Sequence, residues 1–331
     1  MWMLLATVTA AMLSAALIRI IRPLLLKHVL ARPNARSSHR LPTPQGAGIA
    51  VMAATLVVAG TIIAGVDTPG AHFPTAVFVA ALFIAVVGFA DDLRSMPVMA
   101  RLVLQASAVA AILLAAPTDL RVLPAVPFWI ERGLLLLAGL WFVNLVNFMD
   151  GLDWMTVVEV VPITATMIVL GLTGEFPQSP AILAAALCGA MIGFAPFNRP
   201  VATIFLGDVG SLPIGLLLGW CLLQLAWHQQ TTAALLLPLY YLADATLTLL
   251  RRILRGEPFW TGHRSHFYQR ATDNGFSVIG VVSAVFALNL VLAALAIAST
   301  RTQSSAIEVA LIATGAGAVA FLLHRFSHSR K

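Results

Sequence analysis

Acidic residues stand at the ends of long apolar runs in this chain, where a charge is costly. Asp91 and Asp92 are adjacent at the end of the run from Phe73 to Ala90. Two neighbouring carboxylates beside an apolar wall need a cation, or one of them keeps a proton, so the pair is a functional-site candidate. The alternative is a solvated helix end assisted by Arg94. The pair alone does not decide between the two.

A second group carries two amides followed by two carboxylates at helical spacing. Asn144, Asn147, Asp150 and Asp153 are each three residues apart, so a helix would present them along one face. Such a face can hold a metal-bound or hydroxyl-rich ligand. A helix cap explains Asp150 before Gly151, but it does not explain two asparagines deeper in an apolar segment.

Two further motifs supply groups that suit phosphates and Mg²⁺. Asp208 lies between glycines in a Gly-Asp-x-Gly-Ser motif. Glycine lets the backbone approach a phosphate, and one carboxylate with substrate phosphates is a usual Mg²⁺ environment. The polar segment 251–270 combines arginines, Arg264 among them, with His263 and His266. A positive-inside signal would explain its arginines, but histidines point to binding of an oxyanion.

The first polar loop, residues 33–48, is basic and rich in proline. Its residues Asn34, Arg36 and His39 favour a phosphate or a lipid head group as partner, with nonspecific binding of anionic lipid as the alternative. Asp244 lies inside a later apolar run, close enough to the inner end of that run to join the same site.

The composition predicts a membrane protein. Of the 331 residues, 60% are hydrophobic and 10% are charged, whereas soluble domains have about 25% charged residues. A membrane-spanning helix needs about 20 apolar residues. Eleven runs meet this description, at 2–24, 46–66, 74–90, 102–117, 130–149, 154–173, 181–197, 210–227, 232–250, 277–299 and 306–324. We expect an all-α, polytopic transmembrane helix bundle of about 11 spans, forming one domain over residues 1–331.

The distribution of lysine and arginine predicts the orientation of this bundle. The loops 25–45, 91–101, 198–209 and 251–276, with the tail 325–331, hold fifteen of them, and the opposite loops hold three. The positive-inside rule therefore puts the N-terminus outside and the C-terminus in the cytoplasm, with all motifs facing one cytoplasmic cleft. This bias also accounts for the net charge of +6, which is then no argument for nucleic acid as a partner.

In chain order, the motifs resemble those of the polyprenyl-phosphate N-acetylhexosamine-1-phosphate transferases, the family that includes the O-antigen initiators and phospho-N-acetylmuramoyl-pentapeptide transferase. The resemblance spans the chain through five motifs: Pro-Asn-x-Arg-Ser-x-His with Pro-Thr-Pro, Asp-Asp, Asn-x-x-Asn-x-x-Asp-Gly-x-Asp, Gly-Asp-x-Gly-Ser and the basic histidine loop. It implies transfer of a sugar-1-phosphate from a UDP-N-acetylhexosamine to undecaprenyl phosphate, with release of UMP. It also implies a requirement for Mg²⁺, with Mn²⁺ as a substitute, and a place in the bacterial inner membrane.

The residues and the resemblance together give a candidate site. The expected metal ligands are Asp208 and Asp92. The expected catalytic residues are Asp91, Asp92, Asp150, Asp153 and His266. The expected substrate-binding residues are Asn34, Arg36, His39, Asn144, Asn147, Asp244, His263 and Arg264. His266 is followed by Phe-Tyr-Gln where many members have a tight histidine cluster, which favours the O-antigen type over the peptidoglycan enzyme.

The chemistry of two meeting phosphates agrees with these residues. A divalent cation and arginines neutralise charge, and little other covalent work remains for the protein. The acceptor phosphate is already largely an anion near pH 7, so we expect Asp91 and Asp92 to hold the metal or the acceptor and not to abstract a proton.

A different class of protein, a cation- or proton-coupled transporter, also uses acids within membrane helices. A transporter would place these acids near the bilayer midplane in an inverted repeat, whereas here they stand at helix ends. The peptidoglycan transferase is the alternative within the family. The sugar and the oligomeric state, a homodimer included, stay open.

Overall fold

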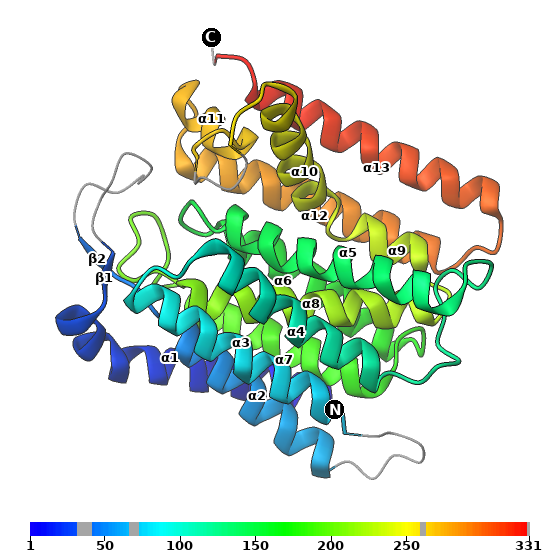
Figure 1. Ribbon diagram of the computed structural model, residues 1–331, viewed down its shortest axis with the longest axis horizontal. Coiled ribbons are helices and arrows are strands. Elements are labelled where there is room, and N and C mark those ends of the chain that lie inside the picture. The colour runs from blue at the N-terminus through cyan, green and yellow to red at the C-terminus, as the bar shows by residue number, and fades with distance from the viewer. Residues whose placement is uncertain (32–41, 66–72, 259–262, 330–331) are drawn as a thin grey trace.

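The computed structural model describes residues 1–31, 42–65, 73–258 and 263–329, and in these ranges the chain is almost wholly helical (Figure 1). The helices are α1 (Trp2–His28), α2 (Gly48–Gly65), α3 (Thr75–Leu93), α4 (Val98–Ala115), α5 (Phe128–Met149), α6 (Met155–Leu172), α7 (Gln178–Phe194), α8 (Asp208–Trp227), α9 (Thr231–Leu236), α10 (Leu239–Leu254), α11 (Phe267–Asp273), α12 (Val278–Ser299) and α13 (Ser305–Phe326). A small antiparallel sheet pairs β1 (Leu30–Ala31) with β2 (Thr43–Pro44). The predicted helix bundle is confirmed.

The helices have the length and composition of membrane spans. Within the described ranges, nine of them are long and apolar enough to cross a membrane, namely α1 to α6, α8, α12 and α13. The apolar helix α7 is shorter, with 17 residues. The chain is therefore a multi-pass membrane protein, and the exact number of spans and their orientation remain predictions.

The eleven predicted runs coincide with helices, but the ninth is divided. The run 232–250 falls on α9 and α10, which are separated by Leu237 and Pro238. Proline supplies no N–H and crowds the preceding turn, which favours a break at this point. The structure thus corrects the expectation of one continuous helix, and it adds the short helix α11 inside the predicted loop 251–276.

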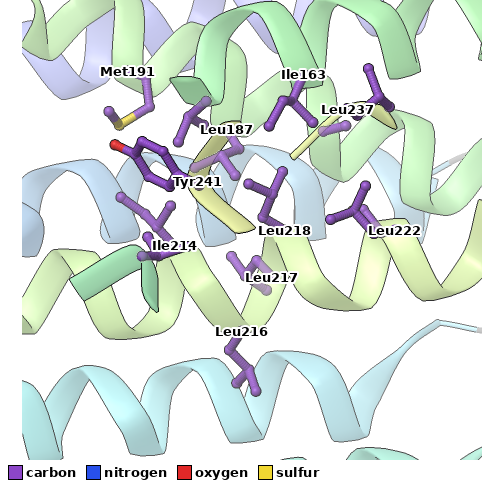
Figure 2. Close-up of a cluster of buried hydrophobic side chains, with 14 of the residues drawn as sticks. Ile163, Leu187, Met191, Ile214, Leu216, Leu217, Leu218, Leu222, Leu237 and Tyr241 are labelled. Carbon is purple, nitrogen blue, oxygen red and sulfur yellow. The ribbon is translucent and has the colours of Figure 1, made fainter. Parts of the chain in front are cut away.

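The centre of the bundle is formed by α7 and α8. Helix α7 packs against α1, α2 and α6, while α8 packs against α3 and α5. Both helices are buried over most of their length, as expected of helices that are apolar all round. Figure 2 shows leucines of α8, such as Leu217 and Leu218, in this core near Tyr241 of α10. Helices α10 to α13 lie together along one side of the bundle (Figure 1).

Two glycines bring the backbones of α2 and α3 against the start of α8. A Cβ atom at Gly48 of α2 would lie 2.3 Å from the Cα of Gly210, and one at Gly88 of α3 would lie 2.2 Å from the carbonyl oxygen of Asp208. Small residues permit such close approach of membrane helices. The end of α3 and the beginning of α8 are therefore held together at one end of the bundle.

Candidate active site

Asp92, near the C-terminal end of α3, binds the N-terminus of α8. Its two carboxylate oxygens accept the backbone N–H groups of Asp208, at 2.9 Å, and Val209, at 3.0 Å. The side-chain amide of Gln45 also donates to Asp92. The first N–H groups of a helix have no partner within the helix, and an anion there is further stabilised by the helix dipole. Asp92 thus serves α8 as a cap supplied by another helix.

Asp91 and Asp208 form the open part of the acidic cluster. Their carboxyl groups lie next to each other. Arg101 of α4 contacts both, with its Nη1 atom 2.7 Å from Asp91 Oδ2 and 3.6 Å from Asp208 Oδ2. The Asp208 side chain is 24% exposed and that of Asp91 is 9% exposed, so Asp208 is the more accessible carboxylate of the two.

The cation beside the acidic pair is Arg101, while Arg94 is exposed. The helix-end interpretation relied on Arg94 because it is closer in sequence. Helix α4 returns alongside α3, and this antiparallel return carries Arg101 back to Asp91. A pairing across two helices of this kind has no local sequence signal, and the residue was missed as a member of the site.

The two asparagines of α5 have different surroundings. Asn147 donates from Nδ2 to Asp208 Oδ1 at 2.7 Å and to Ser211 Oγ at 2.9 Å, so it belongs to the acidic cluster. Asn144 is buried and donates to the Gln105 side chain of α4 at 2.6 Å. The structure therefore brings Asn147 to the site and directs Asn144 into a helix contact.

Asp150 and Asp153 follow α5 and lie in the connection to α6. Asp150 accepts the hydroxyl of Thr156, and burial, with smaller contributions from the charges of Asp92 and Asp153, raises its pKa to about 7 although the hydroxyl acts in the opposite direction. Asp153 is buried and accepts the backbone N–H of Ala202 at 2.9 Å. The charge of Asp92 therefore acts on Asp150, and Asp153 attaches the segment before α8.

Asp244 of α10 organises the histidine loop. Its carboxylate is fully buried and accepts His266 Nδ1 at 3.1 Å, the N–H of Phe267 at 3.0 Å and the N–H of Tyr268 at 3.1 Å. It therefore caps α11 and orients the imidazole of His266. Because Asp244 makes these three hydrogen bonds, it would act on a substrate through His266. A direct contact between Asp244 and substrate would require that some of these hydrogen bonds break.

Tyr268 joins the histidine loop to the end of α5. Burial raises the pKa of its hydroxyl well above the usual value, so the hydroxyl stays protonated and donates to the carbonyl of Phe148 at 3.0 Å. The rings of Phe148 and His266 lie 6.5 Å apart. Through these contacts, the site of Asp91, Asp92, Asn147, Asp150 and Asp208 is continuous with His266.

The remaining predicted residues lie at the edge of this site or outside the described ranges. The His263 ring stacks on His266 at 4.9 Å and its Nδ1 atom lies 2.8 Å from Ser265 Oγ. Arg264 contacts α11 through Thr272 and Asp273. Asn34, Arg36 and His39 fall among residues 32–41, which are outside the described residues, so their predicted role in binding is left as it stands.

The residues present fit a magnesium ion that is held jointly with substrate phosphates. Within the described part of the chain, no group of three or more His, Cys, Asp or Glu side chains is arranged to hold a metal by itself. Mg²⁺ usually binds one or two carboxylates and completes its shell with phosphates and water. Asp208 and Asp91 supply two adjacent carboxylates. Asp91 also accepts the N–H of Met96 at 2.5 Å and Arg101 Nη1 at 2.7 Å, and Asp92 accepts two N–H groups of α8. Among the described residues, Asp208 accepts one hydrogen bond, from Asn147, and is therefore the carboxylate with the most room for a metal.

Part of the sequence is similar to known transferases. Residues 74–226 match the family model described as "Glycosyl transferase family 4". This stretch includes the Asp-Asp pair, the run from Asn144 to Asp153 and the Gly-Asp-x-Gly-Ser motif.

Three curated relatives illustrate the match. A decaprenyl-phosphate N-acetylglucosaminephosphotransferase of Mycobacterium leprae (strain TN) is 29% identical over 211 residues, which cover 55% of this chain and 52% of the relative. A phospho-N-acetylmuramoyl-pentapeptide-transferase of Streptococcus pneumoniae (strain Hungary19A-6) is 33% identical over 125 residues, covering 38% and 36%. A "probable undecaprenyl-phosphate N-acetylglucosaminyl 1-phosphate transferase" of Bacillus subtilis (strain 168) is 29% identical over 187 residues, covering 50% and 51%.

These alignments are partial. The chain spans about half the length of two of the relatives and 36% of the third. The matched part is nevertheless the one that contains most of the acidic site, and the names of all three relatives describe a phosphotransferase reaction on an amino sugar. Residues 74–226, just under half of the 331-residue chain, are therefore similar to glycosyl transferase family 4.

Proposed function

We propose that this protein transfers N-acetylhexosamine-1-phosphate from a UDP-sugar to a polyprenyl phosphate, with undecaprenyl phosphate as the expected acceptor. The observation that carries the proposal is an acidic cluster at one end of the membrane helices, in which Arg101 contacts Asp91 and Asp208 while Asp92 binds the N-terminus of α8. An acceptor lipid can keep its chain in the bilayer while its phosphate lies at this cluster. The names of the relatives support this substrate class.

The reaction joins two phosphates. An oxygen of the acceptor phosphate attacks the phosphorus that carries the sugar, a new P–O bond forms, and the bond from that phosphorus to the bridging oxygen of UMP breaks. The electron pair leaves with UMP, and the product is a polyprenyl diphosphate that carries the sugar. No proton has to be removed from the acceptor, since a phosphate monoester is largely an anion near pH 7.

We assign Asp208 and Asp91 as the groups that would hold Mg²⁺, with Mn²⁺ as a substitute. When bound, the ion would neutralise the phosphate oxygens and stabilise the charge of the transition state. Asp92 keeps Asp208 in place by capping α8, Arg101 supplies positive charge beside the two carboxylates, and Asn147 orients Asp208 through its Oδ1 atom.

His266 is assigned to the phosphates of the donor. Asp244 accepts its Nδ1–H, which fixes the ring and leaves Nε2 as the atom that can meet a phosphate oxygen. The side chains of Asn34, Arg36 and His39, with His263 and Arg264, are proposed to bind substrate. Asp150, whose carboxyl is affected by the charge of Asp92, is also proposed to contact substrate.

We further propose that the site faces the cytoplasm of a bacterial inner membrane and that the product initiates a cell-surface glycan such as O-antigen lipopolysaccharide. The orientation rests on the charge distribution of the loops, and the product rests on the resemblance of the motifs. A single transferase domain, alone or as a homodimer, would suffice for this reaction.

Purified protein in detergent should release UMP from UDP-N-acetylglucosamine when undecaprenyl phosphate and Mg²⁺ are both present. A panel of UDP-N-acetylhexosamines identifies the donor, and Asp208→Asn is the inactive control. If UDP-N-acetylmuramoyl-pentapeptide is the one donor in the panel that gives UMP release, the reaction is that of the peptidoglycan enzyme. No release with any donor, combined with cation or proton flux in vesicles, would contradict the proposal and favour a transporter.

A further inference from the structure

Glu159 is a buried carboxyl group that the proposed reaction does not use. It lies on α6, is fully buried, and sits where α6 meets α12. Among the described residues, no ion pair joins its carboxyl to a lysine, arginine or histidine. An ionised carboxylate without a cation is strongly disfavoured inside a membrane bundle.

The contacts of Glu159 with Asn289 show where a proton would be held. Asn289, at the middle of α12, donates from Nδ2 to Glu159 Oε2 at 2.7 Å and to the carbonyl of Val158 at 2.9 Å. Glu159 Oε1 and Asn289 Oδ1 are buried, and neither has a hydrogen-bond partner within the described part of the chain. Both atoms are acceptors if the carboxyl is ionised, so both would remain unsatisfied at a substantial cost.

A single proton on Glu159 Oε1 removes this conflict. A carboxylic acid and a primary amide can form two hydrogen bonds at once, one from the amide N–H to the acid carbonyl and one from the acid O–H to the amide oxygen. The first of these bonds is present, and the two atoms without partners are the two that the second bond would join.

The same carboxyl contacts the start of α10. This helix begins directly after Pro238, and its first N–H groups have no partner within the helix. The Glu159 carboxyl interacts with the backbone N–H of Tyr241. One turn further along α10, Asp244 holds His266, and Tyr240 donates its hydroxyl to Asp244 at 3.3 Å. The carboxyl therefore contacts α10 and α12 from α6, on the side of α10 that leads to the histidine loop.

We propose that Glu159 is a protonated positioning residue, whose carboxylic acid pairs with the Asn289 amide and fixes the start of α10, the helix that orients His266 through Asp244. The catalytic consequence rests on the proposed transferase function. The acid–amide pair does not depend on that function and can be tested without it.

Infrared difference spectroscopy tests the protonation state directly. Wild-type protein labelled with ¹³C in the glutamate carboxyl groups, compared with unlabelled protein at pH 7, should show the carbonyl stretch of a protonated carboxylic acid. The band should be absent from Glu159→Gln. Only carboxylate bands in the wild-type protein, or an acid band that persists in Glu159→Gln, would overturn the proposal.

Matched variants test the positioning role. A glutamine keeps the neutral charge and the two-bond pairing with Asn289, so Glu159→Gln should retain wild-type thermal stability and UMP release. Glu159→Ala and Asn289→Leu both remove the pair and should lower kcat by about 10- to 100-fold through a misplaced His266, with KM for the acceptor changed little.

The outcomes separate this inference from the proposed function. An inactive but folded Glu159→Gln variant would show that the ionised group is needed and would overturn the inference. If the wild-type protein releases no UMP at all, the proposed function fails, yet the infrared band and the higher thermal stability of Glu159→Gln over Glu159→Ala still decide whether the acid–amide pair exists.

Discussion

The variant Asp92→Asn distinguishes two possible roles of Asp92, as a cap of helix α8 and as a ligand of the metal. In the structure both oxygens of Asp92 accept N–H groups of α8. Asparagine has one oxygen, so its NH₂ group would face one of those N–H groups and leave it without an acceptor. The substitution also removes a negative charge from the N-terminus of α8. The start of α8, which carries Asp208, should therefore lose stability.

The magnitude follows from these two losses. A hydrogen bond to a charged group contributes about 1.5–3 kcal/mol, and the interaction of a charge with a helix terminus about 0.3–1 kcal/mol. We expect the free energy of unfolding to fall by about 2–4 kcal/mol for Asp92→Asn from these terms. If the transition state requires Asp208 where α8 now holds it, the same energy corresponds to a loss of about 30- to 1000-fold in kcat.

The matched variant is Asp208→Asn. This variant keeps the hydrogen bonds between Asp92 and α8 and relieves the repulsion between Asp208 and Asp91, so its thermal stability should equal or exceed that of the wild type. It should nevertheless abolish UMP release, because it removes the carboxylate proposed to hold Mg²⁺. The assays are UMP release as a function of Mg²⁺ concentration and thermal unfolding in detergent without Mg²⁺. A fully stable but inactive Asp92→Asn protein would refute the capping argument, and near-normal activity would refute any essential role of Asp92.

Three further predictions concern the neighbours of this cluster. Arg101→Gln leaves Asp91 and Asp208 without their shared cation and should lower kcat/KM by about tenfold or more. The control Arg94→Gln changes an exposed arginine and should keep kcat/KM near the wild-type value. Equal losses of kcat/KM in the two variants would contradict the pairing of Arg101 with these carboxylates. Tyr268→Phe removes the bond to the carbonyl of Phe148 and should lower the free energy of unfolding by about 1 kcal/mol, measured by thermal unfolding against wild type. The pKa of Asp150 is raised to about 7, so the folded protein binds this proton more tightly than the unfolded chain does, and stability falls as pH rises up to about 7. Asp150→Asn should therefore stabilise the protein more at pH 8 than at pH 5, measured by thermal unfolding relative to wild type. An equal stability difference between variant and wild type at the two pH values would argue against the raised pKa.

The fold could be predicted from the sequence because it depends on long apolar runs. Each run is visible as composition alone, and the structure has a helix at each of them. The break at Pro238 could not be predicted from the proline itself, since Pro162 and Pro213 lie inside helices that continue without a break. Within a membrane bundle, neighbouring helices can supply partners for the backbone groups that a proline frees, so a proline alone does not predict a break.

The composition of the candidate site was visible in the motifs, but the direction of each side chain was not. Three residues advance a helix by about 300°, so successive members of a three-residue repeat rotate by about 60°. Asn144 consequently faces Gln105 of α4 while Asn147 faces α8. Arg101 gave no signal because its partner Asp91 lies on another helix.

The contact of Gly48 and Gly88 with the start of α8 limits how the acidic cluster could change its geometry. No side chain separates these backbones, so the spacing between the Asp91–Asp92 pair and Asp208 is set by the thickness of the peptide chain itself. Mutations in the hydrophobic core cannot adjust that spacing in small steps. If the proposed transfer is correct, variation of the donor sugar would therefore have to arise outside this glycine contact.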